Sequence, residues 1–187
     1  LSSYATLENL PDKVAIQLND THPTLAIPEM MRILLDECGF DWDKAFSICQ
    51  RVFSYTNHTV MAEALEKWNV DIFKMTLPRI YQIVVEMDRR AREKLEAAFP
   101  GDQGKIDYMA LIGDNQVRMA NICAYTANSI NGVSKLHSEI IKESVFHDYY
   151  LFKPNAFKNV TNGIAYRRWL LASNPEPVSY THLTLPT

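Results

Sequence analysis

The sequence of 187 residues lacks any apolar run long enough for a membrane-spanning helix, so no membrane span is predicted. Its 19 basic and 22 acidic residues are mixed along the chain. The formal net charge of −3 therefore gives no electrostatic reason to expect nucleic acid or an anionic membrane as a partner. The sequence also contains no P-loop, no G-x-G-x-x-G after a strand and no G-x-S-x-G elbow. These absences favour a small neutral or weakly charged ligand.

Cysteine is scarce as well. The three cysteines, Cys38, Cys49 and Cys123, are odd in number, far apart and outside the C-x-x-C spacings of zinc and redox sites. We therefore expect buried, reduced thiols, which favour a cytosolic protein. The N-terminal LSSYATLENLPDK has neither an initiator Met nor a signal-peptide pattern, and we expect the chain to begin within a longer protein.

The composition supports a folded domain. Hydrophobic residues make up 47% of the chain and charged residues 22%, which suits the core of one domain or of part of a larger protein. The segment VAIQL (14–18) alternates apolar and polar residues as a half-buried strand does, and NDTHP (19–23) follows it directly. A helix is predicted next, with Thr21 or Asp20 as its N-cap.

The next segments repeat this alternation. DWDKAFSICQ (41–50) predicts a helix and RVFSYT (51–56) predicts a strand. The strand leads through the polar tetrad TNHT (56–59) into MAEALEKW (61–68), where we expect a helix. The chain is therefore predicted to pass from strand to helix at this polar turn, as it does at NDTHP.

A long amphipathic helix is predicted between Leu77 and Phe99, because apolar residues recur every three or four positions until Pro100 and Gly101. Beyond it we expect, in order, a loop (101–115), a buried strand or alternatively a helix (117–126), a helix that starts after Asn131 and Gly132 (133–143), an aromatic connector (146–152) and a short strand (157–160). Strands that alternate with helices indicate an α/β fold with a mostly parallel sheet.

Three polar turns follow predicted strands: NDTHP (19–23), YTNHT (55–59) and VTNGI (160–164). In open α/β sheets, ligands bind outside the carboxyl ends of the strands, where loops lead into helices. The side chains in these turns are amides, hydroxyls, imidazoles and one carboxylate, which suit hydrogen bonds to a ligand rich in hydroxyl groups. The turns therefore favour a sugar as the ligand.

Several of these residues allow more than one interpretation. Asp20 and His22 could be a general acid/base pair, a metal-ligand pair with His58 as the third ligand, or a helix cap beside a structural histidine. His58 could be a core histidine or a binding residue. Asp20 and Glu63 are the one carboxylate pair that could serve a glycosidase, and the signal is weak.

The remaining polar and aromatic residues have similar alternatives. Asn162 and Gly163 could form a tight turn or a hinge between lobes. Trp169 could belong to the core or form a stacking platform. His137 and His147 have no polar cluster near them in the sequence, and both are interpreted as structural.

Five motifs in a fixed order resemble one family. They are KVAIQLNDTHPTLAIPEMMRILLDE, YTNHTVMAEALEKW, LPRIYQIV, NGVSKLHSEIIK and FKNVTNGIAYRRWLLASNP. Together they closely resemble the α-glucan phosphorylases, that is, glycogen, starch and maltodextrin phosphorylases. The resemblance covers about residues 11–175 and identifies the chain as a middle portion of a longer enzyme. Residues 1–161 resemble the late part of the N-terminal lobe and 162–176 the crossover into the C-terminal lobe, whereas PVSYTHLTLPT (177–187) looks like a non-native read-through tail.

The resemblance implies an α/β fold of partial GT-B architecture: part of one of two Rossmann-like lobes, with a mostly parallel sheet and flanking helices. Such enzymes cleave terminal α-1,4-linked glucose with inorganic phosphate, release glucose 1-phosphate and are usually homodimers. They use pyridoxal phosphate, whose own phosphate group donates and accepts the proton. The family's cofactor-binding lysine would lie outside this chain, so the chain alone is expected to be inactive.

The resemblance also assigns residues. His58 and Asn162 resemble the residues that hydrogen-bond the 6-hydroxyl of the glucosyl unit, with Val133 packed near it. Asp20 and His22 correspond to residues that line the cavity beside the anomeric carbon. No catalytic residue and no metal ligand are assigned within this chain.

Trp169 corresponds to an aromatic residue near the cofactor. Ala165 and Tyr166 stand where the family usually has Thr and Pro, and Asn128 stands where it usually has a histidine that contacts the cleft. Lys135 does not lie in the sequence context of the cofactor-binding lysine. Two alternatives remain open: a GT-B glucosyltransferase that uses a nucleotide sugar, and a non-catalytic glucan-binding or regulatory module.

Overall fold

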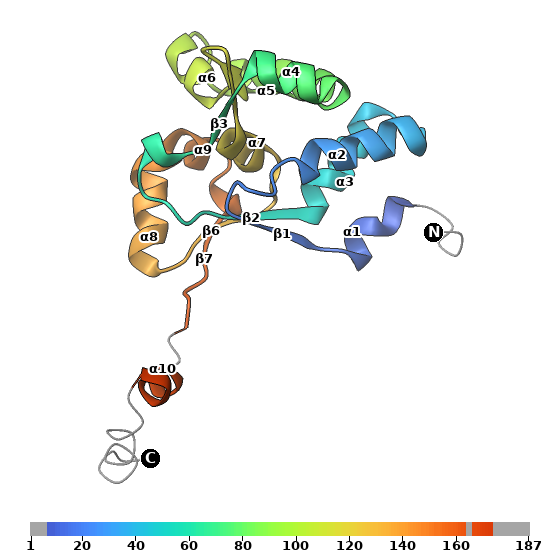
Figure 1. The fold of residues 1–187 in the computed structure, drawn as a ribbon. Helices are drawn as coiled ribbons and strands as arrows, with labels where there is room; N and C mark the ends of the chain where they lie inside the picture. Colours follow the sequence, from blue (N-terminus) through green and yellow to red (C-terminus); the bar gives the residue numbers. More distant parts are fainter. Residues whose placement is uncertain (1–6, 164–165, 174–187) are drawn as a thin grey trace.

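The computed structural model describes residues 7–163 and 166–173 of the chain. Its centre is a parallel sheet in the order β1-β2-β6-β7 (Figure 1). The strands are β1 (Ile16–Asn19), β2 (Phe53–Thr56), β6 (Ile130–Gly132) and β7 (Phe157–Asn159), and every neighbouring pair is parallel. The predicted α/β fold with a mostly parallel sheet is confirmed.

Helix α1 (Leu10–Lys13) precedes β1, and helices α2 (Ala26–Arg32) and α3 (Trp42–Val52) lie between β1 and β2. The prediction of α3 is confirmed, and the Asp41 carboxylate caps it by accepting a hydrogen bond from the Lys44 N–H at 3.0 Å. The predicted cap of α2 is wrong. That helix begins after Leu25, because Thr21 and Thr24 first close a separate turn in which the Thr24 hydroxyl donates to the Thr21 carbonyl.

The chain between β2 and β6 forms a second layer. Its elements are η3 (Ala62–Ala64), β3 (Lys67–Asn69), α4 (Val70–Thr76), α5 (Pro78–Ala98), α6 (Gln103–Met109), β4 (Ile112–Gly113), β5 (Gln116–Arg118) and α7 (Met119–Thr126). Strands β3, β5 and β4 pair as a small antiparallel sheet. In Figure 1, α4, α5 and α6 lie beyond α7, on the side away from the parallel sheet.

Some expectations for this region are confirmed and others are wrong. The long helix α5 is confirmed. The segment 61–68 forms a short 3-10 turn and a strand instead of a helix, because its backbone pairs with β5. The segment 101–115 contains α6, so it is not a simple loop. Residues 119–126 form a helix. Almost all of them are buried, so the sequence lacks the 3.6-residue alternation of apolar and polar residues that would have distinguished a helix from a strand.

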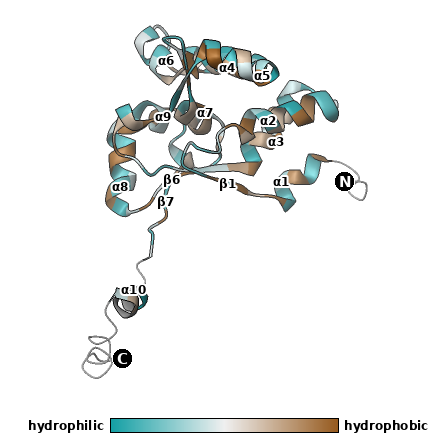
Figure 2. Cartoon of the chain, in the orientation of Figure 1, coloured by the Kyte–Doolittle hydropathy of each residue, from teal (hydrophilic) through white to brown (hydrophobic). Residues whose placement is uncertain are grey.

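The last part of the chain contributes strands β6 and β7 of the parallel sheet and the helices that follow them. It contains α8 (Lys135–Ile140), the π-turn η4 (Ile141–Val145), α9 (His147–Phe152), the 3-10 turn η5 (Pro154–Ala156) and α10 (Tyr166–Ser173). Hydrophobic and hydrophilic residues alternate along α8 in Figure 2, as an amphipathic helix requires. The aromatic connector 146–152 is instead mostly helix α9. The helix predicted over 133–143 is confirmed as α8 with η4, and the Asn131 and Gly132 that precede it belong to strand β6, which lies between β2 and β7.

The two faces of the parallel sheet differ in polarity. Leu18, Phe53 and Tyr55 are at most 1% exposed and point into the helical layer. On the other face, the Thr56 hydroxyl accepts a hydrogen bond from the Gln17 amide and donates one to the Asn131 Oδ1, both at 2.8 Å. The core therefore lies on one side of the sheet. None of the described helices is long and apolar enough to cross a bilayer.

The three cysteines are free thiols, but they are not all buried. Cys49 and Cys123 are fully buried, and burial raises the pKa of each thiol to about 12. Cys38 is exposed, so the expectation of a buried thiol is wrong there. It follows the π-turn after α2 and precedes Gly39, whose φ of 68° turns the chain at the surface.

Candidate functional site

The polar turns meet at one edge of the parallel sheet. Asp20, His58, Val133 and Asn162 each come within three residues of the end of a different strand, and parallel strands place their carboxyl ends on the same edge. Backbone hydrogen bonds join neighbouring turns: Asp20 N–H donates to the Thr56 carbonyl at 2.9 Å, and Asn162 N–H donates to the Val133 carbonyl at 2.9 Å. The structure therefore brings the sequence-predicted turns together.

His58 is exposed, and its imidazole ring makes a hydrogen bond within the chain. Its Nε2 lies 2.6 Å from the Oδ1 of Asn19, the last residue of β1. The preceding Asn57 is fully buried; its amide donates to the Tyr55 hydroxyl at 3.1 Å, and its Oδ1 accepts from the Thr59 N–H at 3.0 Å. Asn57 thus anchors the turn and His58 projects from it. Sequence reasoning did not assign this anchoring role, although an Asn two residues before a Thr is typical of an Asx turn.

Asn162 and Val133 form a second pair. Val133 is half-buried, its N–H donates to His137 Nδ1 at 3.1 Å and its carbonyl binds the Asn162 backbone. Asn162 itself is exposed. Gly163 does not adopt the left-handed φ of a tight Asn-Gly turn, so that interpretation is not supported. Residues 164 and 165, which the hinge hypothesis also involves, lie outside the described residues.

The turn after β1 is built differently. Asp20 has a φ of 64°, a left-handed backbone that is uncommon outside glycine, and its carboxylate accepts from the Thr21 N–H at 2.7 Å. The His22 side chain is 81% exposed, and its Nδ1 lies 3.8 Å from a carboxylate oxygen of Glu66. Glu66 also accepts from the Thr21 hydroxyl at 2.9 Å and from the Trp68 Nε1 at 2.8 Å. Sequence reasoning missed Glu66, because nothing local marks it as a partner of β1.

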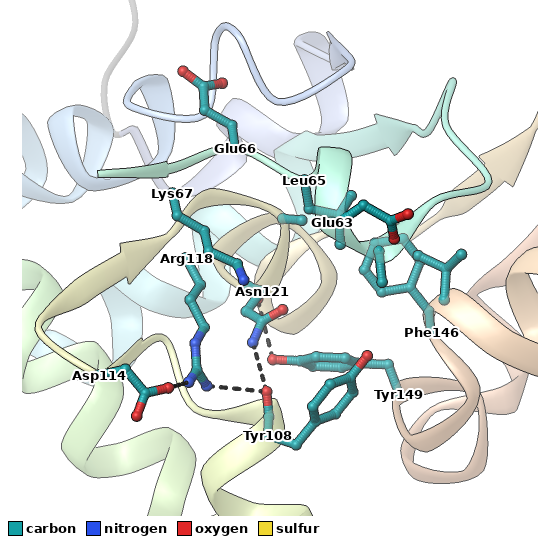
Figure 3. A pocket seen from close by; sticks show the side chains of 13 residues that line it. Glu63, Leu65, Glu66, Lys67, Tyr108, Asp114, Arg118, Asn121, Phe146 and Tyr149 are labelled. Atoms are coloured by element: carbon teal, nitrogen blue, oxygen red, sulfur yellow. Dashed lines mark hydrogen bonds and ion pairs between the residues drawn. The ribbon is translucent and has the colours of Figure 1, made fainter. Parts of the chain in front are cut away.

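A separate pocket of about 300 Å³ is lined in part by the segment 62–67 (Figure 3). Its lining includes Glu63, Lys67, Tyr108, Arg118, Asn121 and Tyr149. Arg118 is bonded to Asp114 at 2.7 Å, and the Asn121 amide donates to the Tyr108 carbonyl at 3.0 Å. Arg118 also donates to the Tyr108 carbonyl at 3.2 Å, so Arg118 and Asn121 together hold β5 and α7 against the end of α6. None of the sequence-predicted binding residues lines this pocket.

The alternative chemistries find little support in the geometry. Within the described part of the chain, no three His, Cys, Asp or Glu side chains are placed to hold a metal ion. Glu63 lies in the pocket of Figure 3, and no hydrogen bond among the described residues joins it to Asp20. Asn128 bonds Ser54 and the Arg51 carbonyl, so it lies at the amino edge of the sheet, opposite the turns that carry His58 and Asn162.

The residues of this chain do not by themselves fit a pyridoxal phosphate site. The turns NDTHP, YTNHT and VTNGI contain no lysine or arginine to bind a phosphate group. Trp169, the residue that resemblance assigns to the cofactor, lies in α10 and is 68% exposed. The core interpretation of Trp169 is therefore not supported by these residues.

Comparison with known proteins completes the description of the chain. The family model described as carbohydrate phosphorylase matches residues 1–185. The chain is 50% identical over 171 residues to the brain form of glycogen phosphorylase from Rattus norvegicus and from Homo sapiens, which covers 90% of this chain and 20% of each relative. It is 50% identical over 168 residues to the human muscle form, covering 88% of this chain and 20% of that relative.

The chain thus spans about a fifth of the length of the curated relatives it matches. The match confirms the resemblance that the five motifs indicated. The chain belongs to the carbohydrate phosphorylase family.

Proposed function

We propose that this chain forms the sugar-facing edge of an α-glucan phosphorylase. The whole protein would cleave terminal α-1,4-linked glucose with inorganic phosphate and release glucose 1-phosphate. The observation that carries the proposal is the convergence of the polar turns: His58 follows β2 and Asn162 follows β7, on either side of β6, and Val133 after β6 accepts a backbone hydrogen bond from Asn162. Exposed imidazole and amide groups of this kind suit a neutral hydroxyl-rich ligand.

Each residue has a distinct part in this proposal. His58 and Asn162 bind the 6-hydroxyl of the terminal glucosyl unit, and the half-buried Val133 packs beside it. Asp20 and His22 line the cavity on the β1 side, beside the anomeric carbon. These groups bind and orient the sugar. None of them is proposed as the proton donor.

The cofactor of the whole protein is proposed to be pyridoxal phosphate, which supplies the phosphate group for proton transfer when it is bound. Trp169 would lie near it, and the attachment lysine would come from another part of the protein. The same reasoning assigns residues 1–161 to one Rossmann-like lobe of a GT-B fold and 162–176 to the crossover. The whole protein is proposed to be a cytosolic homodimer, and the 187-residue chain alone to be inactive.

The first experiment measures glucose 1-phosphate release from glucan and phosphate by the full-length protein that carries this segment, and by the 187-residue chain. Activity in the full-length protein alone is the expected result. A requirement for a nucleotide sugar would favour the glucosyltransferase alternative. Glucan binding by a full-length protein without any release of glucose 1-phosphate would favour the binding module.

A second experiment tests the residues. In the full-length enzyme, His58→Ala and Asn162→Ala should each lower kcat/KM for glucose 1-phosphate by about tenfold, since each removes one hydrogen bond to the sugar. Asn155→Ala is the matched control, because Asn155 is also an exposed amide but lies in η5, just before the amino end of β7 and therefore away from the carboxyl ends of the strands. Equal effects of Asn162→Ala and Asn155→Ala would contradict the assignment of Asn162.

A further inference from the structure

His137 lies in the first turn of α8 and uses both ring nitrogens, although its sequence context marked it as merely structural. It is 7% exposed. Its Nδ1 accepts from the Val133 N–H at 3.1 Å, and its Nε2 lies 2.9 Å from the Thr59 carbonyl oxygen. An N–H group can only donate and a carbonyl can only accept, so these two partners require the neutral ring with its proton on Nε2.

The two partners of His137 belong to the two turns that carry the proposed sugar-binding residues. Thr59 directly follows His58, and its own N–H is bonded to Asn57. The Val133 peptide is bonded on both sides: its N–H binds His137 and its carbonyl binds the Asn162 N–H at 2.9 Å. The His137 imidazole therefore bonds the turn of His58 directly and is linked to the turn of Asn162 through the Val133 peptide.

The position of His137 is itself fixed by the start of α8. The Ser134 hydroxyl caps the helix by accepting from the His137 N–H at 3.1 Å. The helix also packs closely on β6: a Cβ built at Gly132 would lie 2.8 Å from the Ser138 Oγ and 2.9 Å from its Cα. The Ser138 hydroxyl in turn donates to Asn159 Oδ1 at the end of β7. The ring is thus held relative to β6 and β7.

We propose that His137 is a positioning residue for the 6-hydroxyl of the sugar. It does not touch the ligand. It sets the separation of His58 and Asn162, so that both can bond one hydroxyl group without first reordering two turns. This inference rests on the proposed function, because it names the residue that makes that same site selective for a 6-hydroxyl.

Two substitutions separate the two bonds of the ring. The side-chain amide of Asn lies near the place of imidazole Nδ1, and that of Gln near the place of Nε2. His137→Asn therefore keeps an acceptor for Val133 and loses Thr59, whereas His137→Gln keeps a donor for Thr59 and loses Val133. His147→Gln is the matched control, because the His147 ring also bonds the backbone, with Nδ1 3.1 Å from the Lys142 carbonyl oxygen, but it lies away from the carboxyl ends of the strands.

The readout is the ratio of kcat/KM for glucose 1-phosphate to kcat/KM for 6-deoxyglucose 1-phosphate, measured with the full-length enzyme in the direction of glucan elongation. Both His137 variants should lose about three- to tenfold of this preference, the range expected for one hydrogen bond, and His147→Gln should keep it. The ratio does not depend on the fraction of folded enzyme, since both substrates meet the same active molecules. A variant that is only less stable would lower both values equally.

Three results would overturn the inference, and they differ. If the unsubstituted enzyme makes no use of glucose 1-phosphate, the proposed function fails and the inference fails with it. If His58→Ala keeps the preference for the 6-hydroxyl, the assignment of His58 fails, and His137 no longer has a pair of contacts to hold at a fixed separation. If His58→Ala loses the preference but both His137 variants keep it, the sugar site stands and His137 has no positioning role.

Discussion

The carboxyl edge of the parallel sheet has two halves that the chain holds in different ways. In the first, which we call the braced half, His58, Val133 and Asn162 are joined through His137 and the backbone. In the second, which we call the open half, Asp20 adopts a left-handed backbone and bonds its own neighbour, and the His22 side chain is 81% exposed. The difference indicates that bonds within this chain fix the turns of the braced half more closely than the turn of the open half.

The open half depends on longer and more solvated contacts. His22 Nδ1 approaches Glu66 only to 3.8 Å, which is too long for a hydrogen bond, and the 81% exposure of the His22 side chain leaves it open to water. The chain therefore fixes the His22 side chain only loosely. The braced half should therefore respond most strongly to changes within this chain.

The largest effect is expected for Gly132→Ala. The added methyl group would lie within 3 Å of the Ser138 backbone, so α8 would have to move away from β6. We expect a loss of about 3 kcal/mol of stability, the upper part of the usual range for overpacking a well-packed site. The measurement is the shift in unfolding midpoint of the protein in urea.

Gly163→Ala is the control for this substitution. A Cβ there meets no atom within 4 Å and Gly163 has no positive φ, so its midpoint should change little. If the two alanine variants unfold at the same urea concentration, then α8 is not held tightly against β6. The braced half would then lack the rigid support that distinguishes it from the open half.

A smaller effect is expected from Lys153, which binds the carboxyl end of α7, the helix that leads into β6 of the braced half. Its ammonium group donates to the carbonyls of Ala124, Tyr125 and Ala127, the last at 2.7 Å. Burial, together with the nearby positive charge of Lys94, lowers the pKa of Lys153 from 10.5 to about 8. Between about pH 8 and pH 10.5, the unfolded chain therefore binds more protons than the folded chain.

This sign means that the folded state gains stability from Lys153 as the pH rises through that window. We expect the gain to be about 2 kcal/mol. It is measured as the difference in unfolding free energy between the parent and Lys153→Met at pH 7.5 and at pH 10.5, which cancels the titration of other groups. A difference that stays constant with pH would show that the pKa of Lys153 is the same in the folded and unfolded states.

The sequence predicted the elements whose pattern is complete within one segment. Helix α5 has a clear 3.6-residue period, and β1 and β2 have alternating or apolar runs that end at polar turns. Strand β6 could not be found in this way, because its three residues become a strand only by pairing with β2 and β7. Helix α7 is buried on nearly all sides and so has no polar face to reveal its period.

The same limit applies to the candidate site. The rule that ligands bind at the carboxyl ends of parallel strands was enough to select the turns of His58 and Asn162. Residues that act from a distance were missed. His137 lies 78 residues from Thr59, and Glu66 lies 45 residues from Thr21, so neither contact has a signature in the local sequence.

The smallest effects separate the two halves directly in the full-length enzyme. Asn19→Ala removes the partner that lies 2.6 Å from the His58 ring and should lower kcat/KM for glucose 1-phosphate by about fivefold, the value of one hydrogen bond. Glu66→Gln keeps one oxygen that can accept from Trp68 and gains an amide N–H that can donate to the Thr21 hydroxyl oxygen. It also weakens a 3.8 Å contact with His22, so it should change kcat/KM by less than about twofold. Asn155→Ala again serves as the neutral control. If Glu66→Gln lowers kcat/KM more than Asn19→Ala does, the open half contributes more to sugar binding than the braced half. Sugar binding would then depend chiefly on the turn after β1. The bonds around His137 would in that case stabilise the fold and not the bound ligand.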